Sequence, residues 1–325
     1  MGGVSRERCS AALPSDRFYC LLDELPLHLL PRSAARVKRL QGGNLRLNPN
    51  CILCPAGKLP EELAGESEVL SAFALQATIA WVRQPGGSLI PFWLGPKLQA
   101  ALREVTSGET TKASLDPFSR WVLETAGIVC SDEVTKRPER QQTITKASAL
   151  FRDKGYAPLP GLIHPFHVAA LRRYYRHKIR TGAIPLGDGQ SPLRYVAYND
   201  PVARFFHQRL TSTLSAVAGE PIKPSYVYLA SYLSGAELRK HTDREQCEFS
   251  ITLCLDFSPE PALATPWPIH LDTTTGKVTV YQALGDGLAY RGTRLPHYRS
   301  KLAEGQTSTS IFFHYVAADF TGSLD

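Results

Sequence analysis

Two histidines and one aspartate, separated by a stretch of strand-like sequence, constrain the fold of this chain most. His241 and Asp243 flank a threonine, and His297 lies 56 residues after His241. In an extended segment, residues two apart project from the same side, so His241 and Asp243 can reach one ion without a bend in the backbone. For His297 to join them, the strands in between must go around a small barrel and return beside the start. Two histidines and a carboxylate suit a ferrous iron that keeps further coordination positions open. The other histidines, including His314 in an apolar strand, have no carboxylate in such a pattern and are predicted to be structural.

The chain contains a second copy of the His-x-Asp pattern, so the pattern alone does not identify the metal ligands. His270 and Asp272 precede a threonine-rich turn and a further strand over residues 278–281. This order predicts a β-hairpin in which the second copy is an ordinary strand end. The first copy is favoured because a strand and a glycine turn precede it and an alternating strand over residues 247–255 follows it.

A tyrosine-rich strand comes before the first copy. Alternate side chains of a strand share a face, so the sequence places Tyr226, Tyr228 and Tyr232 on one face and Val227 and Leu229 on the other. This pattern predicts an interior face lined by tyrosines. For Tyr226 an ordinary strand tyrosine with its rim in water is the simpler interpretation.

The order of elements predicts an α+β protein in two parts. Residues 131–142 are polar, have no apolar period and contain a proline, which indicates a linker. After it we expect helices over residues 165–180 and 201–217, and then strands to the end. We therefore divide the chain into an N-terminal domain, residues 1–140, and a C-terminal domain, residues 141–325.

The N-terminal domain is predicted to be small and mainly helical, with some likeness to a winged-helix domain. We expect helices over residues 61–82 and 96–105, and a third between Asp116, as N-cap, and Gly127. Such a module can hold a substrate or partner, or it can be a packing extension. The apolar stretch over residues 69–82 has about 14 residues, too few to span a membrane. It predicts a buried helix and no membrane partner.

Cysteine usage indicates a reducing compartment. The chain has seven cysteines at irregular spacing, which argues against a disulfide framework, and residues 1–16 lack the apolar core of a secretory signal. We therefore expect a cytoplasmic protein. Cys51 and Cys54 allow an alternative, a zinc or redox site with Cys9 and Cys20. No second cysteine or histidine pair completes the four ligands that zinc needs.

The net charge of +7 is compatible with an acidic partner. The densest basic cluster, residues 172–178, has the pattern of one amphipathic helix with a solvated face. A nucleic-acid partner is therefore not expected.

Taken together, these features resemble the Fe(II)/2-oxoglutarate-dependent oxygenase superfamily, with its prolyl-hydroxylase-like and phytanoyl-hydroxylase-like members. The resemblance covers roughly residues 145–325. The features that carry it are Gly155-Tyr156 with a following helix, Tyr228 with the Tyr-Leu-Ser-Gly segment at 232–235, His241 and Asp243, the Gly-Asp-Gly-Leu-Ala-Tyr segment at 285–290, His297, and the strand at 310–316. The resemblance implies a double-stranded β-helix, the jelly roll of the cupins, with flanking helices.

The resemblance also implies the cofactors. His241, Asp243 and His297 would bind Fe(II), and 2-oxoglutarate would chelate the iron and react with O2 to give succinate. The role of the protein is then to position the metal, the cosubstrate and the target C–H bond relative to one another.

The distal carboxylate of 2-oxoglutarate needs a cation. Many family members place it early in the strand after the distal histidine, where this chain has no cation in residues 306–310. Arg299 and Lys301 alternate with His297 and are the nearest replacements. Arg299 is preferred because a guanidinium matches carboxylate geometry better than an ammonium does. Further hydroxyl contacts are expected from Tyr228 and from Thr309 or Ser310.

The activity implied is hydroxylation of a C–H bond in a peptide, an amino-acid-like molecule or a natural product. Asp243 argues against halogenation, because halogenating members replace this carboxylate with a small residue. Two alternatives remain: a catalytically silent jelly-roll domain that only binds, and a nucleic-acid-modifying oxygenase, whose affinity would fall steeply with salt.

Overall fold

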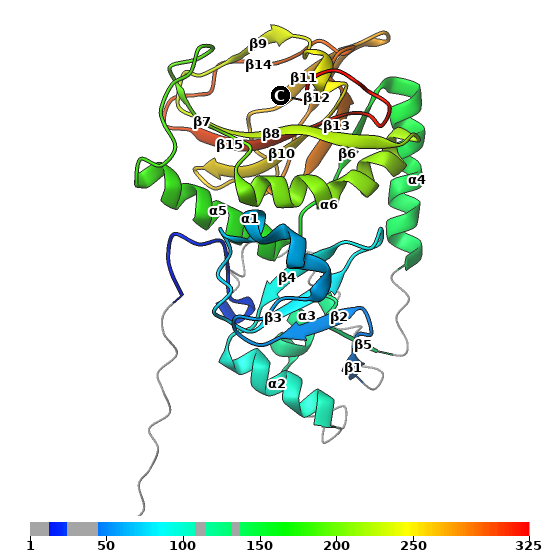
Figure 1. Cartoon of the computed structure of the whole chain (residues 1–325). Helices are drawn as coiled ribbons and strands as arrows, with labels where there is room; N and C mark the ends of the chain where they lie inside the picture. Colours follow the sequence, from blue (N-terminus) through cyan, green and yellow to red (C-terminus); the bar gives the residue numbers. More distant parts are fainter. Residues whose placement is uncertain (1–12, 25–44, 108–114, 132–136, 325) are drawn as a thin grey trace, which may run out of the picture.

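The C-terminal part of the chain is built from two antiparallel sheets that face each other. The computed structural model describes residues 13–24, 45–107, 115–131 and 137–324. A six-stranded sheet has the order β6-β13-β10-β15-β8-β7, and a four-stranded sheet has the order β12-β11-β14-β9 (Figure 1). The strands are β6 (Tyr156–Leu159), β7 (Arg194–Tyr198), β8 (Ile222–Tyr232), β9 (Leu238–His241), β10 (Phe249–Ser258), β11 (Ile269–Thr273), β12 (Gly276–Val280), β13 (Gly287–Arg291), β14 (His297–Arg299) and β15 (Thr307–Ala317).

From β8 onward the chain passes back and forth between these sheets. β8, β10, β13 and β15 lie in the larger sheet, and β9, β11, β12 and β14 lie in the smaller one. This alternation is the arrangement of a jelly roll. It confirms the predicted α+β class and brings β9 and β14 into direct pairing, although they are far apart in the sequence.

Two helices, α5 (Pro165–Arg180) and α6 (Pro201–Ala218), cover the outer face of the larger sheet. Both were predicted to within one residue, because each begins with a proline just after an N-cap: His164 for α5 and Asp200 for α6. Val227 and Leu229 of β8 pack in the main apolar cluster on this helical side. The tyrosines of β8 point the other way, into the space between the sheets, as predicted from their alternation. Tyr226 is buried there, so the simpler interpretation that its rim lies in water is wrong.

The basic cluster on α5 is only in part the solvated face that was expected, because Arg172 is buried whereas the Arg176 side chain is 56% exposed. Arg172 and Arg176 both form ion pairs with the buried Asp256 of β10, at 2.9 and 2.5 Å. Lys178 pairs with Asp200 at 2.6 Å. These cations fasten α5 to the sheet and to α6, so they are not free for a nucleic acid.

The N-terminal part combines helices with short strands, and the prediction of a mainly helical domain missed the strands. Two small sheets are present, β1-β5 and β2-β3-β4. The elements are β1 (Leu45–Leu47), β2 (Cys51–Cys54), a 3₁₀ helix (Glu61–Glu66), α1 (Ser67–Leu70), β3 (Ile79–Arg83), β4 (Leu89–Trp93), α2 (Pro96–Ser107), α3 (Pro117–Thr125) and β5 (Val129–Ser131), with a 3₁₀ turn at Leu22–Glu24.

The helix expected over residues 61–82 is confirmed only over residues 61–70, as the 3₁₀ helix and α1, and its second half is wrong for a physical reason. Strand β3 is buried on both faces and therefore lacks the alternation that identifies a strand. Helices α2 and α3 are confirmed, and Asp116 caps α3 by accepting hydrogen bonds from the backbone N–H groups of Phe118 and Ser119.

The predicted linker holds a helix in its second half, since α4 spans Arg137–Lys154, while residues 132–136 lie outside the described part. One apolar cluster continues across this region: Phe18 packs against Trp93 of β4 and against Phe206 of α6, with ring centroids 5.4 and 5.8 Å apart. A division into two domains at residue 140 stays a prediction. In the part of the chain that the structure describes, no helix is long and apolar enough to cross a membrane.

Candidate metal centre

His241, Asp243 and His297 converge at one point of the smaller sheet. His241 ends β9 and His297 begins β14, and the two residues are direct partners in the pairing of these strands, with ring centroids 4.4 Å apart. Asp243 lies just beyond β9, where its backbone N–H donates to the carbonyl of Gly292 at 2.9 Å. Its Oδ1 atom is 3.5 Å from Nε2 of His241 and 3.5 Å from Nε2 of His297. The three ligand atoms therefore face one small volume.

Both imidazole rings are oriented by backbone carbonyls. His241 Nδ1 bonds the carbonyl oxygen of Arg239 at 2.8 Å, and His297 Nδ1 bonds that of Leu295 at 3.0 Å. A proton on Nδ1 leaves the Nε2 lone pair free, which is how metal-binding histidines are usually held. The two rings thus present the atoms that a divalent metal needs.

The carboxylate is held in its charged form. Burial raises the pKa of Asp243, but hydrogen bonds with His241 and His297 outweigh it, and the pKa falls well below its ordinary value. The bond to Asp243 raises the pKa of His241. A Cβ atom at Gly292 would overlap this carboxylate and the carbonyl of Cys247, so only glycine fits here.

The site is open on one side. The His297 side chain is 3% exposed and that of Asp243 is 11% exposed, whereas that of His241 is 40% exposed. A substrate can therefore approach from the side of His241.

The second His-x-Asp pattern faces away from this site. Across β11 and β14, Leu271 is the partner of His297 and His270 is the partner of Tyr298. Directly opposed residues share a face, so Leu271 points inward with His297, and His270 and Asp272 point outward. Asp272 pairs with Lys240 at 2.6 Å. The predicted hairpin of β11 and β12 is present.

Arg299 is a buried cation between the sheets, two residues after His297. It is 5% exposed and donates to the carbonyl of Trp267 and to Oε1 of Gln282. Its Nε atom has no hydrogen-bond partner. Among the described residues, Arg299 forms no ion pair with a carboxylate. Burial lowers the pKa of Arg299. Such a group calls for an anionic ligand, because an unpaired buried charge is costly.

A second buried arginine shows the contrast. Arg194 of β7 was not singled out from the sequence, and it also belongs to the interior, beside Tyr232. Its charge is already compensated by Asp188 at 2.6 Å. Among the buried arginines of the described residues, Arg299 has no carboxylate partner, unlike Arg194 and Arg172.

Hydroxyl groups in the same interior also lack partners among the described residues. Ser310 Oγ on β15 and Thr252 Oγ1 on β10 are buried without a hydrogen bond. Ser310 was predicted as a contact, whereas Thr252 was missed because a threonine in a buried strand gives no signal of its own. Tyr228 also faces the interior, stacked on Phe312 with ring centroids 4.6 Å apart. These side chains lie in the interior between the two sheets, as the candidate metal ligand His297 does.

Two predicted contacts are not in this space. Thr309 points to the other face of β15, where its hydroxyl bonds Ser231 Oγ at 2.8 Å. Lys301 is exposed, because β14 ends at Arg299 and the alternation with His297 stops there.

The zinc alternative receives no support. Among the described residues, only two groups of three have ligand atoms close enough for a metal: His241, Asp243 and His297, and Asp243, Cys247 and His314. Cys51 and Cys54 belong to neither and carry free thiols at the ends of β2, and burial raises the pKa of Cys51 to about 12. Cys20 is also free, and Cys9 lies outside the described residues.

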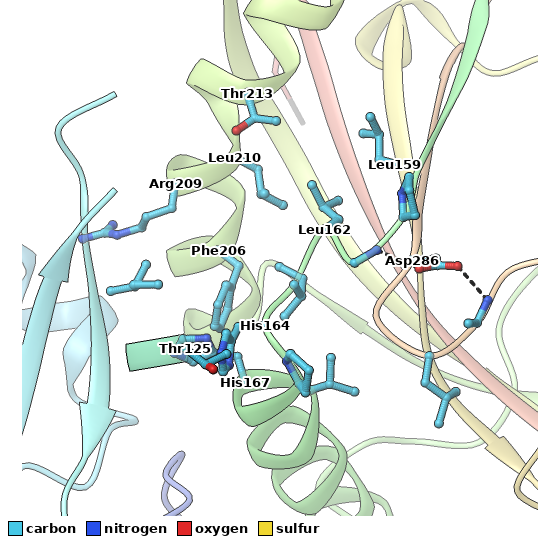
Figure 2. Close-up of a pocket in the computed structure, with 18 of the residues that line it drawn as sticks. Thr125, Leu159, Leu162, His164, His167, Phe206, Arg209, Leu210, Thr213 and Asp286 are labelled. Carbon is cyan, nitrogen blue, oxygen red and sulfur yellow. Dashed lines mark hydrogen bonds between the residues drawn. The ribbon is translucent and has the colours of Figure 1, made fainter. Parts of the chain in front are cut away.

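A separate cavity of about 1270 Å³ lies on the helical side of the larger sheet. Its wall includes Phe92 of β4, Leu162, and Phe206 and Leu210 of α6. Asp286 also lines it and accepts hydrogen bonds from the backbone N–H groups of Gly161 and Ala283 (Figure 2). None of the three candidate metal ligands lines it.

Comparisons with known proteins give structural likeness only. No family model matches the chain, and no curated protein matches it. Among solved structures, the chain is similar to SnoN, a non-heme alpha ketoglutarate dependent epimerase from nogalamycin biosynthesis, with 15% identity over 55% of this chain and 82% of that one and a TM-score of 0.46. It is similar to a Pseudomonas putida prolyl-4-hydroxylase, with 15% identity over 54% and 98% of the two chains and a TM-score of 0.44. It is also similar to AviO1 from Streptomyces viridochromogenes, with 19% identity over 55% and 97% and a TM-score of 0.45.

Proposed function

We propose that this protein is an Fe(II)- and 2-oxoglutarate-dependent oxygenase of the superfamily that its sequence resembles. The observation that carries the proposal is the convergence of His241 Nε2, His297 Nε2 and Asp243 Oδ1 between two strands of a jelly roll. Two imidazoles and one carboxylate on one side of a metal are the ligand set of non-haem Fe(II) oxygenases, which leave the opposite positions open.

The surrounding residues fit the cosubstrate. Arg299 would hold the distal carboxylate of 2-oxoglutarate, assisted by the hydroxyls of Ser310 and Thr252, which are buried without a hydrogen-bond partner. A guanidinium suits this role because it can donate two parallel hydrogen bonds to a carboxylate. When bound, the iron with 2-oxoglutarate and O2 supplies oxidative decarboxylation to succinate and oxidation of a C–H bond.

The protein's own groups orient the proposed metal ligands and exclude water from the interior. The carbonyls of Arg239 and Leu295 fix the two imidazole rings. Burial raises the pKa of Tyr228 well above its ordinary value, so its hydroxyl stays protonated and can donate to an anionic ligand. Two apolar clusters within the jelly roll, one around Trp267 and one around Tyr290, flank Arg299 and His297 and keep water from the interior.

The proposed reaction is hydroxylation of a peptide, an amino-acid-like molecule or a natural product in the cytoplasm. The exposed side of His241 is where such a substrate would enter. The free thiols of all six described cysteines support a reducing compartment, which also suits ferrous iron. A silent binding domain is not favoured, because Arg299 is buried in the interior, where it would serve as the cation for the distal carboxylate.

Turnover tests this proposal. The protein is reconstituted with Fe(II) without oxygen, 2-oxoglutarate and O2 are then added, and succinate is measured with and without candidate substrates. We expect succinate from the wild type and from a His270→Ala control, and none above background from His297→Ala. Equal succinate release from wild type and His297→Ala would overturn the proposal.

A further inference from the structure

The second oxygen of Asp243 has a partner of its own. Ser250 Oγ lies 3.2 Å from Asp243 Oδ2, on the side of the carboxylate that faces away from the two histidines. The same hydroxyl lies 2.8 Å from Nδ1 of His314, and both Ser250 and His314 are buried, with 0% and 2% exposure. The three side chains therefore form a continuous chain of contacts behind the candidate metal site.

The direction of these hydrogen bonds follows from the number of protons. A serine hydroxyl has one proton to donate, and an ionised carboxylate only accepts. A bond to a charged acceptor is stronger than a bond to the neutral carbonyl of Cys247, which is also farther away at 3.3 Å. Ser250 therefore donates to Asp243, and His314 Nδ1–H donates to Ser250. Each bond polarises the next toward the negative charge.

His314 is itself held in place by aromatic rings. Its ring lies against Tyr226 and Tyr228, with centroids 4.7 and 5.7 Å away, on the inner face of the larger sheet. Ser250 and His314 are opposed across β10 and β15, so the backbone pairing fixes their separation. The strand pairing and the packed imidazole of His314 therefore fix the position of the Ser250 hydroxyl.

We propose that His314 and Ser250 are positioning residues that hold Asp243 Oδ2 away from the metal, so that Asp243 binds through Oδ1 alone. A carboxylate can bind one metal through both oxygens, and the second oxygen would then occupy a position that cosubstrate or O2 needs. The hydrogen-bonded chain prevents this because Oδ2 is already engaged. The inference rests on the proposed metal centre and assigns a role to two residues outside the three proposed ligands.

The test compares four variants under anaerobic conditions with Co(II), whose visible absorption changes with coordination number. Ser250→Ala and His314→Leu break the chain of bonds. His314→Asn keeps an N–H group near the position of Nδ1. Ser231→Ala is the matched control, because it removes a buried hydroxyl of the same sheet that bonds only Thr309 on the other face.

We expect Ser250→Ala and His314→Leu to raise the Kd for Co(II) by at least about tenfold, the usual effect of losing an outer contact to a metal ligand, and to change the absorption spectrum. His314→Asn should restore both values toward the wild type, and Ser231→Ala should leave both unchanged. Wild-type Kd and spectrum in Ser250→Ala and His314→Leu would overturn the inference while leaving the proposed oxygenase intact. Absence of Co(II) binding by the wild type would overturn both. Thermal unfolding of each variant identifies any that does not fold, and the remaining member of the pair Ser250→Ala and His314→Leu then decides.

Discussion

At the scale of single residues, the charge of Arg299 is the feature that most needs a ligand. A buried guanidinium normally lies beside a carboxylate, as Arg194 lies beside Asp188. Arg299 has only a backbone carbonyl and the side-chain oxygen of Gln282 as acceptors, and its Nε is free. The apo protein therefore carries an electrostatic cost that an anion at this point would relieve.

Replacing Arg299 should weaken 2-oxoglutarate binding sharply. A hydrogen bond to a charged group contributes about 1.5 to 3 kcal/mol, so Arg299→Ala should raise the KM for 2-oxoglutarate by roughly 10-fold to 100-fold, with Arg299→Lys in between. The control is Lys301→Ala, which removes an exposed cation two residues away. Unchanged KM in Arg299→Ala would remove the assignment.

Residue patterns revealed part of this site and not the rest. Arg299 was predictable because it alternates with His297, and Lys301 was a wrong alternative because the alternation ends with β14. Ser250, Thr252 and His314 could not be predicted, since a polar residue in a buried strand has no signature until the register of β10 and β15 places it opposite its partners.

At the scale of elements, buried histidines connect helices to strands. His207 of α6 donates from Nε2 to the carbonyl of His314 on β15 at 2.7 Å, and it is 3% exposed. Burial lowers the pKa of His207 to about 3, because there is no room to solvate the imidazolium. The helix is therefore docked on the sheet only with a neutral ring.

This histidine should make stability depend on pH. Its folded pKa lies below the ordinary value of about 6.5, so the unfolded chain binds the proton more readily and the stabilisation is complete above about pH 6.5 and lost as the pH falls toward 3. His207→Gln keeps an N–H donor but has no charge to gain. From about 1.4 kcal/mol per pH unit, the wild type should lose about 2 kcal/mol of unfolding free energy between about pH 8 and pH 5 that the variant does not.

Denaturant titrations at the two pH values check this. Near pH 8 the imidazole of His207 is neutral and the glutamine of the variant carries no charge, so the comparison there isolates any difference in packing. If the wild type and His207→Gln lose the same free energy between the two pH values, the account of this contact is wrong.

Element boundaries were predicted unevenly, for reasons that lie in burial. Helices α5 and α6 have clear start signals and one apolar face, and both were predicted closely. Strand β3 is buried on both sides, so its apolar run had the appearance of a helix. Tertiary pairing with β2 and β4 decides that segment, and a single sequence does not show it.

At the scale of the whole molecule, helices α5 and α6 pack against two parts of the chain. One face of this pair packs on the jelly roll, and the other packs on the N-terminal strands (Figure 1). Phe166 of α5 contacts Trp93 of β4 at 6.2 Å between ring centroids, and His167 bonds the carbonyl of Pro91 at 2.7 Å. The N-terminal part therefore completes the apolar core of the C-terminal part.

The full chain should unfold in a single cooperative transition, because one apolar cluster spans both parts. Residues 141–325 expressed alone should be destabilised and prone to aggregation, since the helices would expose apolar side chains. Calorimetry of the full chain and of this fragment checks both points. Two separate transitions, or a stable fragment, would show that the parts fold independently.

The most direct test of the central claim is metal binding by matched aspartate variants. Asp243→Ala removes the shared carboxylate of the proposed centre, and Asp272→Ala makes the same change in the second His-x-Asp pattern, whose aspartate faces outward and pairs with Lys240. Anaerobic titration calorimetry with Fe(II) should give one bound metal per chain for the wild type and for Asp272→Ala, and no specific binding for Asp243→Ala. Wild-type binding by Asp243→Ala, or loss of binding in Asp272→Ala, would contradict the account.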